Sequence, residues 1–193
     1  DKIAEKHAVA SFSEFYELHS LPNDAHFTAD IEKNVKWCEN AFAKRGFATK
    51  RLNTETVPLL LAERKVKNAK KTVLIYLQID GQPVDPQKWE QESPWKPTLK
   101  EKNTEGKWVT IPFEKLKTEL NRDWRIFVRS ASDAKGPAMA CIASLDALAE
   151  LKRETNFNIK VIMDFEEELG SPHLPEAVNR YKTERSEEHT SEL

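Results

Sequence analysis

The stretch Thr72-Val-Leu-Ile-Tyr-Leu-Gln-Ile-Asp-Gly-Gln-Pro83 constrains the fold more than any other part of the sequence. Its first eight residues, Thr72–Ile79, are a nearly continuous apolar run, which is typical of a strand buried on both faces. A polar turn follows at once, beginning with Asp80 and Gly81. We therefore expect a buried strand that ends in a carboxylate at one edge of its sheet.

The remaining chain alternates helical and strand patterns around this run. Besides 72–79, strands are expected over 47–53, 57–63, 124–129 and 158–164. Helices are expected over 3–19, 28–45 and 136–152, and a last helix is expected after Ser171-Pro172. Residues 81–122 have weak periodicity and predict a long functional loop with short strands. Helices placed between strands indicate an α/β fold.

Composition excludes several classes of function. The 193 residues carry 30 Lys and Arg against 32 Asp and Glu, a formal net charge of −2. That balance predicts no nucleic-acid-binding surface and no acidic tail. The longest apolar runs fall far short of the roughly 20 residues that a membrane-spanning helix needs. Two cysteines are too few for a disulfide framework or a four-cysteine zinc site, and five glycines form no phosphate-binding loop.

The two ends of the sequence carry their own expectations. The last nine residues, Arg185–Leu193, match the in-frame translation of a common sequencing adapter and have no apolar periodicity. We therefore expect residues 185–193 not to be native, and the protein to continue beyond Glu184. The sequence begins at Asp1 without a visible signal peptide. The compartment, cytoplasmic or periplasmic and secreted, therefore stays open.

Three acidic motifs each follow a predicted strand. They are Gln78–Pro83, Ser132–Pro137 and Asp164–Ser171. In open α/β sheets, ligands bind beyond the carboxyl ends of the strands, so these motifs are expected to converge. Converging carboxylates raise one another's pKa unless a cation or solvent stabilises them, and such oxygen-rich clusters hold metals. Taken singly, the motifs have simpler explanations: a turn, a helix N-cap at Asp133 and a solvated acidic loop.

The order of these motifs resembles the N-terminal part of a zinc metallopeptidase family. That family includes carnosinase, carboxypeptidase G, acetylornithine deacetylase and succinyl-diaminopimelate desuccinylase, and it carries His-x-Asp, Ser-Asp-x-Lys-Gly and Glu-Glu-x-Gly-Ser. The corresponding segments here are Gln78-Ile-Asp80, Ser132-Asp-Ala-Lys-Gly136 and Glu167-Glu-Leu-Gly-Ser171. The similarity covers about residues 10–180, and Gln82-Pro-Val84 looks most like the dipeptidase branch.

The resemblance implies a fold and a set of roles. The fold is a three-layer α/β catalytic domain with a mostly parallel central sheet, incomplete at its C-terminus, of which residues 1–184 form the N-terminal part. Asp133 would bridge two metal ions and Glu168 would bind one of them. Glu167 would be the general base, and Asp80 would orient the ligand two residues before it. Such metals acidify a water molecule and polarise the scissile carbonyl.

The same resemblance implies partners for the parent protein. The cofactor would be one or two zinc ions, with manganese or cobalt as alternatives, and no organic cofactor is implied. The substrate would be a small peptide or an N-acyl amino acid, and a homodimeric parent is compatible with the family. Further ligands and a lid domain lie downstream of Glu184 in the family. The chain as written is therefore expected to be inactive and, with an exposed sheet edge, poorly soluble.

One residue departs from the family pattern: Gln78 stands where the first histidine ligand is expected. An amide oxygen is a weaker ligand than imidazole and suits harder metals. Gln78 could still point its oxygen at a metal and donate to Asp80. The alternatives are a weakened or different metal site, a mono-metal enzyme, or a non-catalytic pseudo-peptidase. If the resemblance is set aside, the motifs indicate only an acidic α/β domain that binds a cation such as Mg²⁺ or Ca²⁺.

Two further residues have expected structural roles. Lys135 is expected to donate hydrogen bonds to nearby carbonyls or carboxylates and not to act as a nucleophile. His173, beside Pro172 at a helix start, is expected to cap the helix or lie at the surface and not to bind a metal.

Overall fold

The computed structural model of the protein describes residues 2–191. Its long helices are α1 (Lys2–His19), α2 (Thr28–Ala43), α3 (Lys135–Glu150) and α4 (Leu174–Ser191). Its strands are β1 (Ala48–Leu52), β2 (Leu59–Arg64), β3 (Thr72–Gln78), β4 (Thr98–Lys102), β5 (Trp108–Thr110), β6 (Arg125–Phe127) and β7 (Asn158–Asp164). Three short 3₁₀ helices complete the order: η1 (Pro86–Lys88), η2 (Phe113–Lys117) and η3 (Glu167–Leu169).

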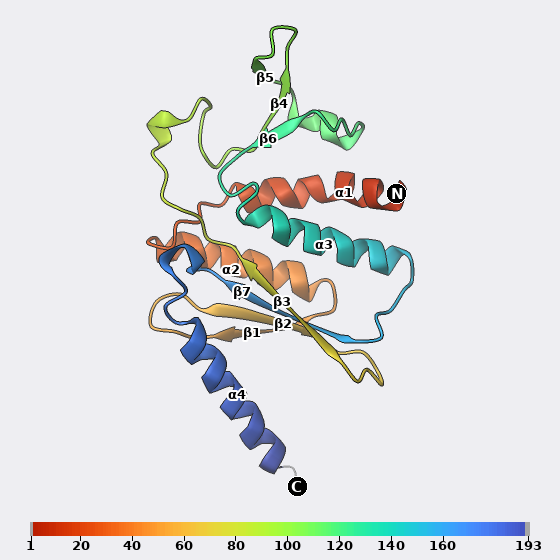
Figure 1. The fold of residues 1–193 in the computed structure, drawn as a ribbon, viewed down its shortest axis with the longest axis vertical. Coiled ribbons are helices and arrows are strands. Elements are labelled where there is room, and N and C mark those ends of the chain that lie inside the picture. The colour runs from red at the N-terminus through yellow and green to blue at the C-terminus, as the bar shows by residue number, and fades with distance from the viewer. Residues whose placement is uncertain (1, 192–193) are drawn as a thin grey trace.

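Four strands form the main sheet in the order β1-β2-β7-β3. β1, β2 and β7 are paired antiparallel, whereas β3 runs parallel to β7. Helices α2 and α3 cover one face, α1 packs beside α3, and α4 lies on the opposite face (Figure 1). The α/β fold with three layers is therefore confirmed, and the sheet within it is mixed.

Alternation along the inner strands explains why the sheet is covered on both faces. Leu60 and Ala62 of β2 face the helices α2 and α3, where Phe42 and Ile142 are buried. Leu59 and Leu61 point the other way and pack with Ala177 of α4. A strand that is apolar on both faces needs a helix layer on each.

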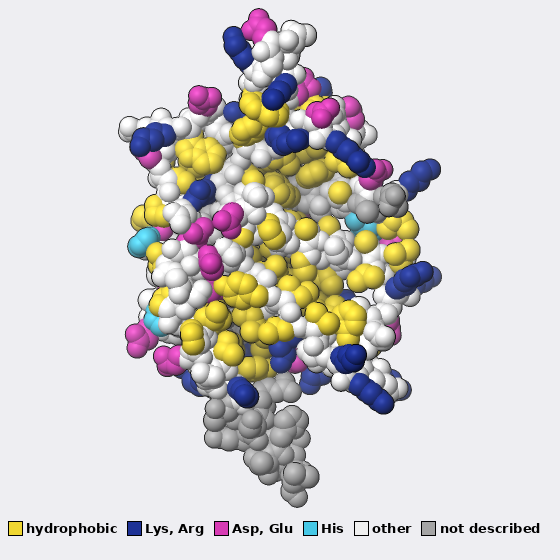
Figure 2. Space-filling view, in the orientation of Figure 1, with side chains coloured by type: hydrophobic (Ala, Val, Ile, Leu, Met, Phe, Trp, Pro, Cys, Tyr) yellow, Lys and Arg dark blue, Asp and Glu magenta, His cyan; other side chains and the backbone are white. Residues whose placement is uncertain are grey.

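β3 lies at one edge of this sheet, and most of its side chains are exposed. Val73, Leu74 and Tyr76 are 41%, 59% and 44% exposed. Figure 2 shows hydrophobic side chains over this strand and acidic side chains near its carboxyl end. The expectation that Thr72–Ile79 is buried on both faces is therefore wrong. Among the described residues β3 pairs only with β7, so one side of it has no neighbouring strand.

Substituting Leu74 with Lys should reduce self-association of the 193-residue chain. An exposed apolar edge strand is a template for pairing with another chain, and a charge on it opposes that pairing. Because Leu74 is largely exposed, the free energy of unfolding should change by no more than about 0.5 kcal/mol. Light scattering over a concentration series measures the effect. Leu151→Lys, the same change at a 45% exposed residue away from the sheet edge, should leave the self-association unchanged.

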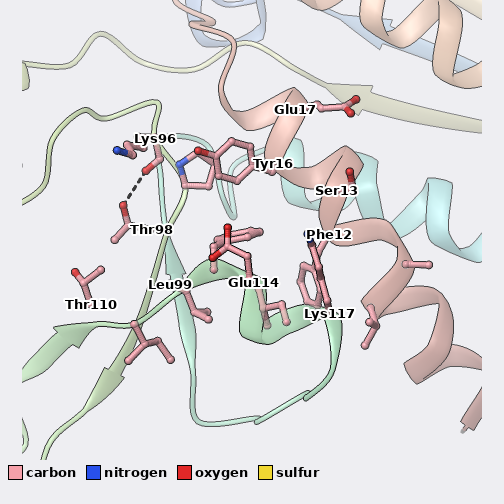
Figure 3. A pocket seen from close by; sticks show the side chains of 16 residues that line it. Phe12, Ser13, Tyr16, Glu17, Lys96, Thr98, Leu99, Thr110, Glu114 and Lys117 are labelled. Atoms are coloured by element: carbon pink, nitrogen blue, oxygen red, sulfur yellow. Dashed lines mark hydrogen bonds between the residues drawn. The ribbon is translucent and has the colours of Figure 1, made fainter.

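Residues 81–122 contain more regular structure than the sequence predicts. Strands β5, β4 and β6 form a three-stranded antiparallel sheet, and Leu99, Leu116 and Trp124 make its core with Phe12 of α1. A cavity of about 750 Å³ lies between α1 and this small sheet (Figure 3). None of the expected catalytic or metal-binding residues lines it.

The predicted helices agree with the observed ones to within a few residues. The last helix begins at Leu174 and not directly after Ser171-Pro172, since Ser171 has a φ of +51° and belongs to the preceding turn. α4 ends at Ser191, and residues 192–193 lie outside the described residues. The adapter origin of residues 185–193 stays a prediction. No helix in the described range is long and apolar enough to cross a membrane.

Candidate active site

The parallel pairing of β3 with β7 brings the acidic motifs to one edge of the sheet. Gln78, the last residue of β3, lies opposite Asp164, the last residue of β7. The Gln78 side-chain nitrogen donates to Glu167 Oε2 at 2.8 Å and to Asp133 Oδ1 at 3.2 Å. Glu167 comes from η3 after β7, and Asp133 precedes α3. The predicted convergence of the three motifs is therefore confirmed by side-chain contacts.

Asp80 fixes the backbone of the third motif. Its carboxylate is fully buried. It accepts the backbone amide of Glu167 at 3.1 Å and that of Glu168 at 3.0 Å. Burial raises the pKa of Asp80 to about 6, although the two amide donors act in the opposite direction. The residue thus determines where η3 presents its two glutamates. The expected hydrogen bond from Gln78 to Asp80 is not among those of the described residues, since the Gln78 amide donates to Glu167 and Asp133. That Asp80 orients a metal ligand at position 78 stays a prediction.

Glu168 is held separately from the other two carboxylates. Its Oε2 accepts a hydrogen bond from the side-chain nitrogen of Gln82 at 2.8 Å. The side-chain amides of Gln78 and Gln82 therefore donate hydrogen bonds to three of the four carboxylates that the sequence analysis assigned to metal binding and catalysis, all except Asp80. Gln82 belongs to the first motif, but the sequence analysis assigned it no role of its own in the site.

The first glutamate of the triplet has a different environment. Glu166 is buried and accepts from the hydroxyl of Thr56, while His173 Nδ1 lies 2.9 Å from its Oε2. This carboxylate raises the pKa of His173. His173 therefore pairs with Glu166. None of the hydrogen bonds of the described residues joins it to the residues that the sequence analysis expected in the site. These contacts connect the loop after β7 to the turn before β2.

Two buried polar residues that sequence reasoning missed support the end of β3. Asn23, in the turn after α1, donates to the Ile79 carbonyl at 2.7 Å and to the Ser130 hydroxyl at 2.9 Å. Gly81 lies against both side chains. A Cβ at Gly81 would come 2.4 Å from Ser130 Oγ, so a larger residue would displace this support. Asn and Ser are common in turns, which is why neither drew attention as a site residue.

The second motif is anchored by the lysine that follows Asp133. Lys135 is fully buried, and its ammonium donates to the carbonyls of Leu18 at 2.8 Å and Leu21 at 2.7 Å. Its expected role as a donor to carbonyls is confirmed. The next residue must be glycine, since a Cβ at Gly136 would lie 2.1 Å from the Ala131 carbonyl oxygen. The peptide bond between Asp133 and Ala134 is cis.

The buried imidazole of His19 predicts a loss of stability in acid. Burial, reinforced by the Lys135 ammonium, lowers the pKa of His19 from 6.5 to about 3. A base whose pKa is depressed by folding adds stability that is fully present above pH 6.5 and is lost as the pH falls toward 3. Between these two pH values the unfolded state binds up to one proton more than the folded state, so the free energy of unfolding falls by as much as about 1.4 kcal/mol per pH unit.

The measurement is the free energy of unfolding of wild type and His19→Gln between pH 8 and 4.5. The difference between the two proteins should shrink as the pH falls. The comparison is needed because Asp80, with a raised pKa, contributes in the opposite direction between about pH 6 and 4. His26→Gln, at an exposed imidazole beside Asp24, is the control and should parallel wild type. A constant difference between His19→Gln and wild type would contradict the prediction.

The described residues fit a metal ion only in part. The carboxylates of Asp133 and Glu168 are suitable oxygen donors for a divalent cation. Among the residues whose side chains are described, 2–3 and 5–182, no group of three His, Cys, Asp or Glu side chains is placed to hold one. Gln78 also turns its amide nitrogen, a donor, toward Asp133 and Glu167. The carboxylates of Asp133 and Glu168 thus fit a divalent metal ion, and the side chain of Gln78, as it is oriented here, does not.

Comparison with known proteins finds relatives for about two thirds of the chain. No protein-family model matches the chain. It is 33% identical over 125 residues to the human Beta-Ala-His dipeptidase, which covers 65% of this chain. It is 31% identical over 123 residues, 63% of this chain, to the Cys-Gly metallodipeptidase of Schizosaccharomyces pombe. The chain is thus similar in sequence to two dipeptidases, one of which is named a metallodipeptidase.

A solved structure extends this relationship to the fold. An M20 family metallo-carboxypeptidase from Sulfolobus solfataricus matches 90% of the chain with a TM-score of 0.69 and 27% identity. The resemblance drawn from the three motifs is thereby confirmed. The matches span 20% and 21% of the lengths of the two dipeptidases and 35% of the solved chain. The chain therefore corresponds to a limited part of each relative.

Proposed function

We propose that the full-length protein hydrolyses a peptide bond in a small peptide, such as a dipeptide, or the amide bond of an N-acyl amino acid. The convergence of Asp133, Glu167 and Gln78 at the carboxyl edge of β3 and β7 carries this proposal. The homologous dipeptidases support it. The 193-residue chain alone is proposed to be inactive, because no complete ligand set is present in its described part.

Each acidic residue has a proposed role in that reaction. Asp133 and Glu168 are the proposed metal ligands, and one or two zinc, manganese or cobalt ions are the proposed cofactor. A bound ion of this kind acidifies water and polarises a carbonyl. Glu167 accepts the proton of the attacking water as general base. Asp80 positions Glu167 and Glu168 through their backbone amides.

The test is dipeptide hydrolysis by the full-length protein after treatment with a chelator. Activity should disappear and return when Zn²⁺, Mn²⁺ or Co²⁺ is added back. Turnover that survives exhaustive chelation would rule out a metal-dependent reaction. The oligomeric state can be measured on the same samples, since a homodimer is the proposed assembly of the parent.

A non-catalytic homologue is the second candidate function. The observation that favours it is the orientation of Gln78, whose amide nitrogen faces Asp133, a proposed metal ligand, and Glu167, the proposed general base. Such a protein would bind a peptide at the same edge of the sheet without cleaving it. It predicts peptide binding but no turnover with any of the three metals.

A further inference from the structure

The hydrogen bonds of Gln78 form a neutral bridge between two acidic side chains. Its NH₂ group has two hydrogens, and the contacts to Glu167 Oε2 and Asp133 Oδ1 account for both. The orientation of the amide follows from the chemistry. A carbonyl oxygen turned toward two carboxylates would be repelled, whereas the nitrogen side donates to them.

This bridge supplies what the two carboxylates lack. Carboxylates that converge destabilise each other's charged form unless a cation or hydrogen-bond donors compensate. Among the described residues, neither Asp133 nor Glu167 forms an ion pair with a Lys, Arg or His side chain. Gln78 is therefore a hydrogen-bond donor that the two carboxylates share.

We infer that the Gln78 amide, which bridges Asp133 and Glu167, occupies the position beside Asp133 that a bound cation would take, and that a divalent cation binds Asp133 only by displacing this amide. The inference rests on the proposed function for the identity of the site. It adds that Gln78 opposes metal binding and is not a ligand. Competition of this kind lowers the metal affinity without changing the carboxylates themselves.

Removal of the amide distinguishes these two roles. If Gln78 competes with the cation, Gln78→Leu leaves two carboxylates without a donor and should bind Zn²⁺ and Mn²⁺ about tenfold more tightly than wild type. If Gln78 is a ligand, the same substitution should weaken binding. Gln78→His, which adds an imidazole donor for metals, should also bind Zn²⁺ more tightly than wild type under the inference.

The experiment measures Zn²⁺ and Mn²⁺ dissociation constants of the full-length protein by competition with a chromophoric chelator. Gln87→Leu is the matched control, because Gln87 is an exposed residue of η1 outside the carboxylate cluster, and its affinities should equal those of wild type. Equal or weaker binding by Gln78→Leu overturns the inference. Thermal unfolding with and without the cation provides a second measurement if Gln78→Leu is less stable. The midpoint shift should be larger for Gln78→Leu than for wild type.

These results separate the inference from the proposed function. Tighter metal binding by Gln78→Leu, together with no dipeptide turnover by the full-length wild type with any of the three metals, would support the inference and refute the peptidase. Turnover by wild type together with weaker binding by Gln78→Leu would support the peptidase and make Gln78 a ligand. If Gln78→Leu does not fold, Gln78→Asn shortens the amide by one methylene and weakens the bridge. It is then expected to bind more tightly than wild type, and the inference fails if it does not.

Discussion

Glu167→Gln is expected to reduce peptide hydrolysis by the full-length protein by about 10²- to 10⁴-fold, the range typical of a lost general base. The substitution removes the basic oxygen and keeps the size of the side chain. Its amide oxygen can still accept the hydrogen bond that Gln78 donates to Glu167. The metal content should be unchanged, because Glu167 is proposed to move a proton and not to bind the ion.

The measurements for this prediction are turnover and bound metal in the same preparation. Glu154→Gln is the matched control, since Glu154 is an exposed residue before β7, at the other end of that strand from Glu167. Its turnover should equal that of wild type. Retention of full turnover by Glu167→Gln would remove Glu167 from the mechanism. An equal loss of turnover and of metal would make it a ligand.

Lys135→Met is expected to lower the free energy of unfolding by about 2–4 kcal/mol. This is somewhat less than the combined contribution of two hydrogen bonds from a charged donor in a buried site. Methionine has a similar shape but donates nothing, so the carbonyls of Leu18 and Leu21 lose their contacts with the ammonium. Burial also lowers the pKa of Lys135 to about 7. The substitution therefore relieves part of a desolvation cost, which keeps the expected loss below the sum of both hydrogen bonds.

Denaturant unfolding of the 193-residue chain measures this loss. Lys67→Met makes the same change at an exposed lysine in the loop between β2 and β3. Its unfolding free energy should stay within about 0.5 kcal/mol of wild type. If Lys135→Met were as stable as Lys67→Met, the two carbonyl contacts would contribute nothing to the fold.

The sequence predicted the parts of the site that depend on local pattern. Apolar periodicity placed β3 and β7, and parallel strands share their carboxyl edge, so Asp80 and Glu167 could be expected to meet. Lys135 belongs to a short motif and was likewise expected to have a structural role. These features need only a strand, the turn after it and the direction of the chain.

The features that the sequence did not predict depend on distant parts of the chain. Thr72–Ile79 has the composition of a central strand, but its exposure follows from the strand order, which local pattern does not encode. Asn23 contacts the Ile79 carbonyl across 56 positions of sequence. The donor orientation of Gln78 also depends on two carboxylates from other motifs.

The position of β3 at the side of the sheet affects how the site opens. Among the described residues, a single ladder of hydrogen bonds, to β7, holds this strand along its length. Gln78 ends that strand and Asp80 follows two residues later. Local opening of this one ladder would release the Gln78 amide and the Asp80 carboxylate together, so hydrogen exchange along β3 reports directly on the lifetime of the assembled carboxylate cluster.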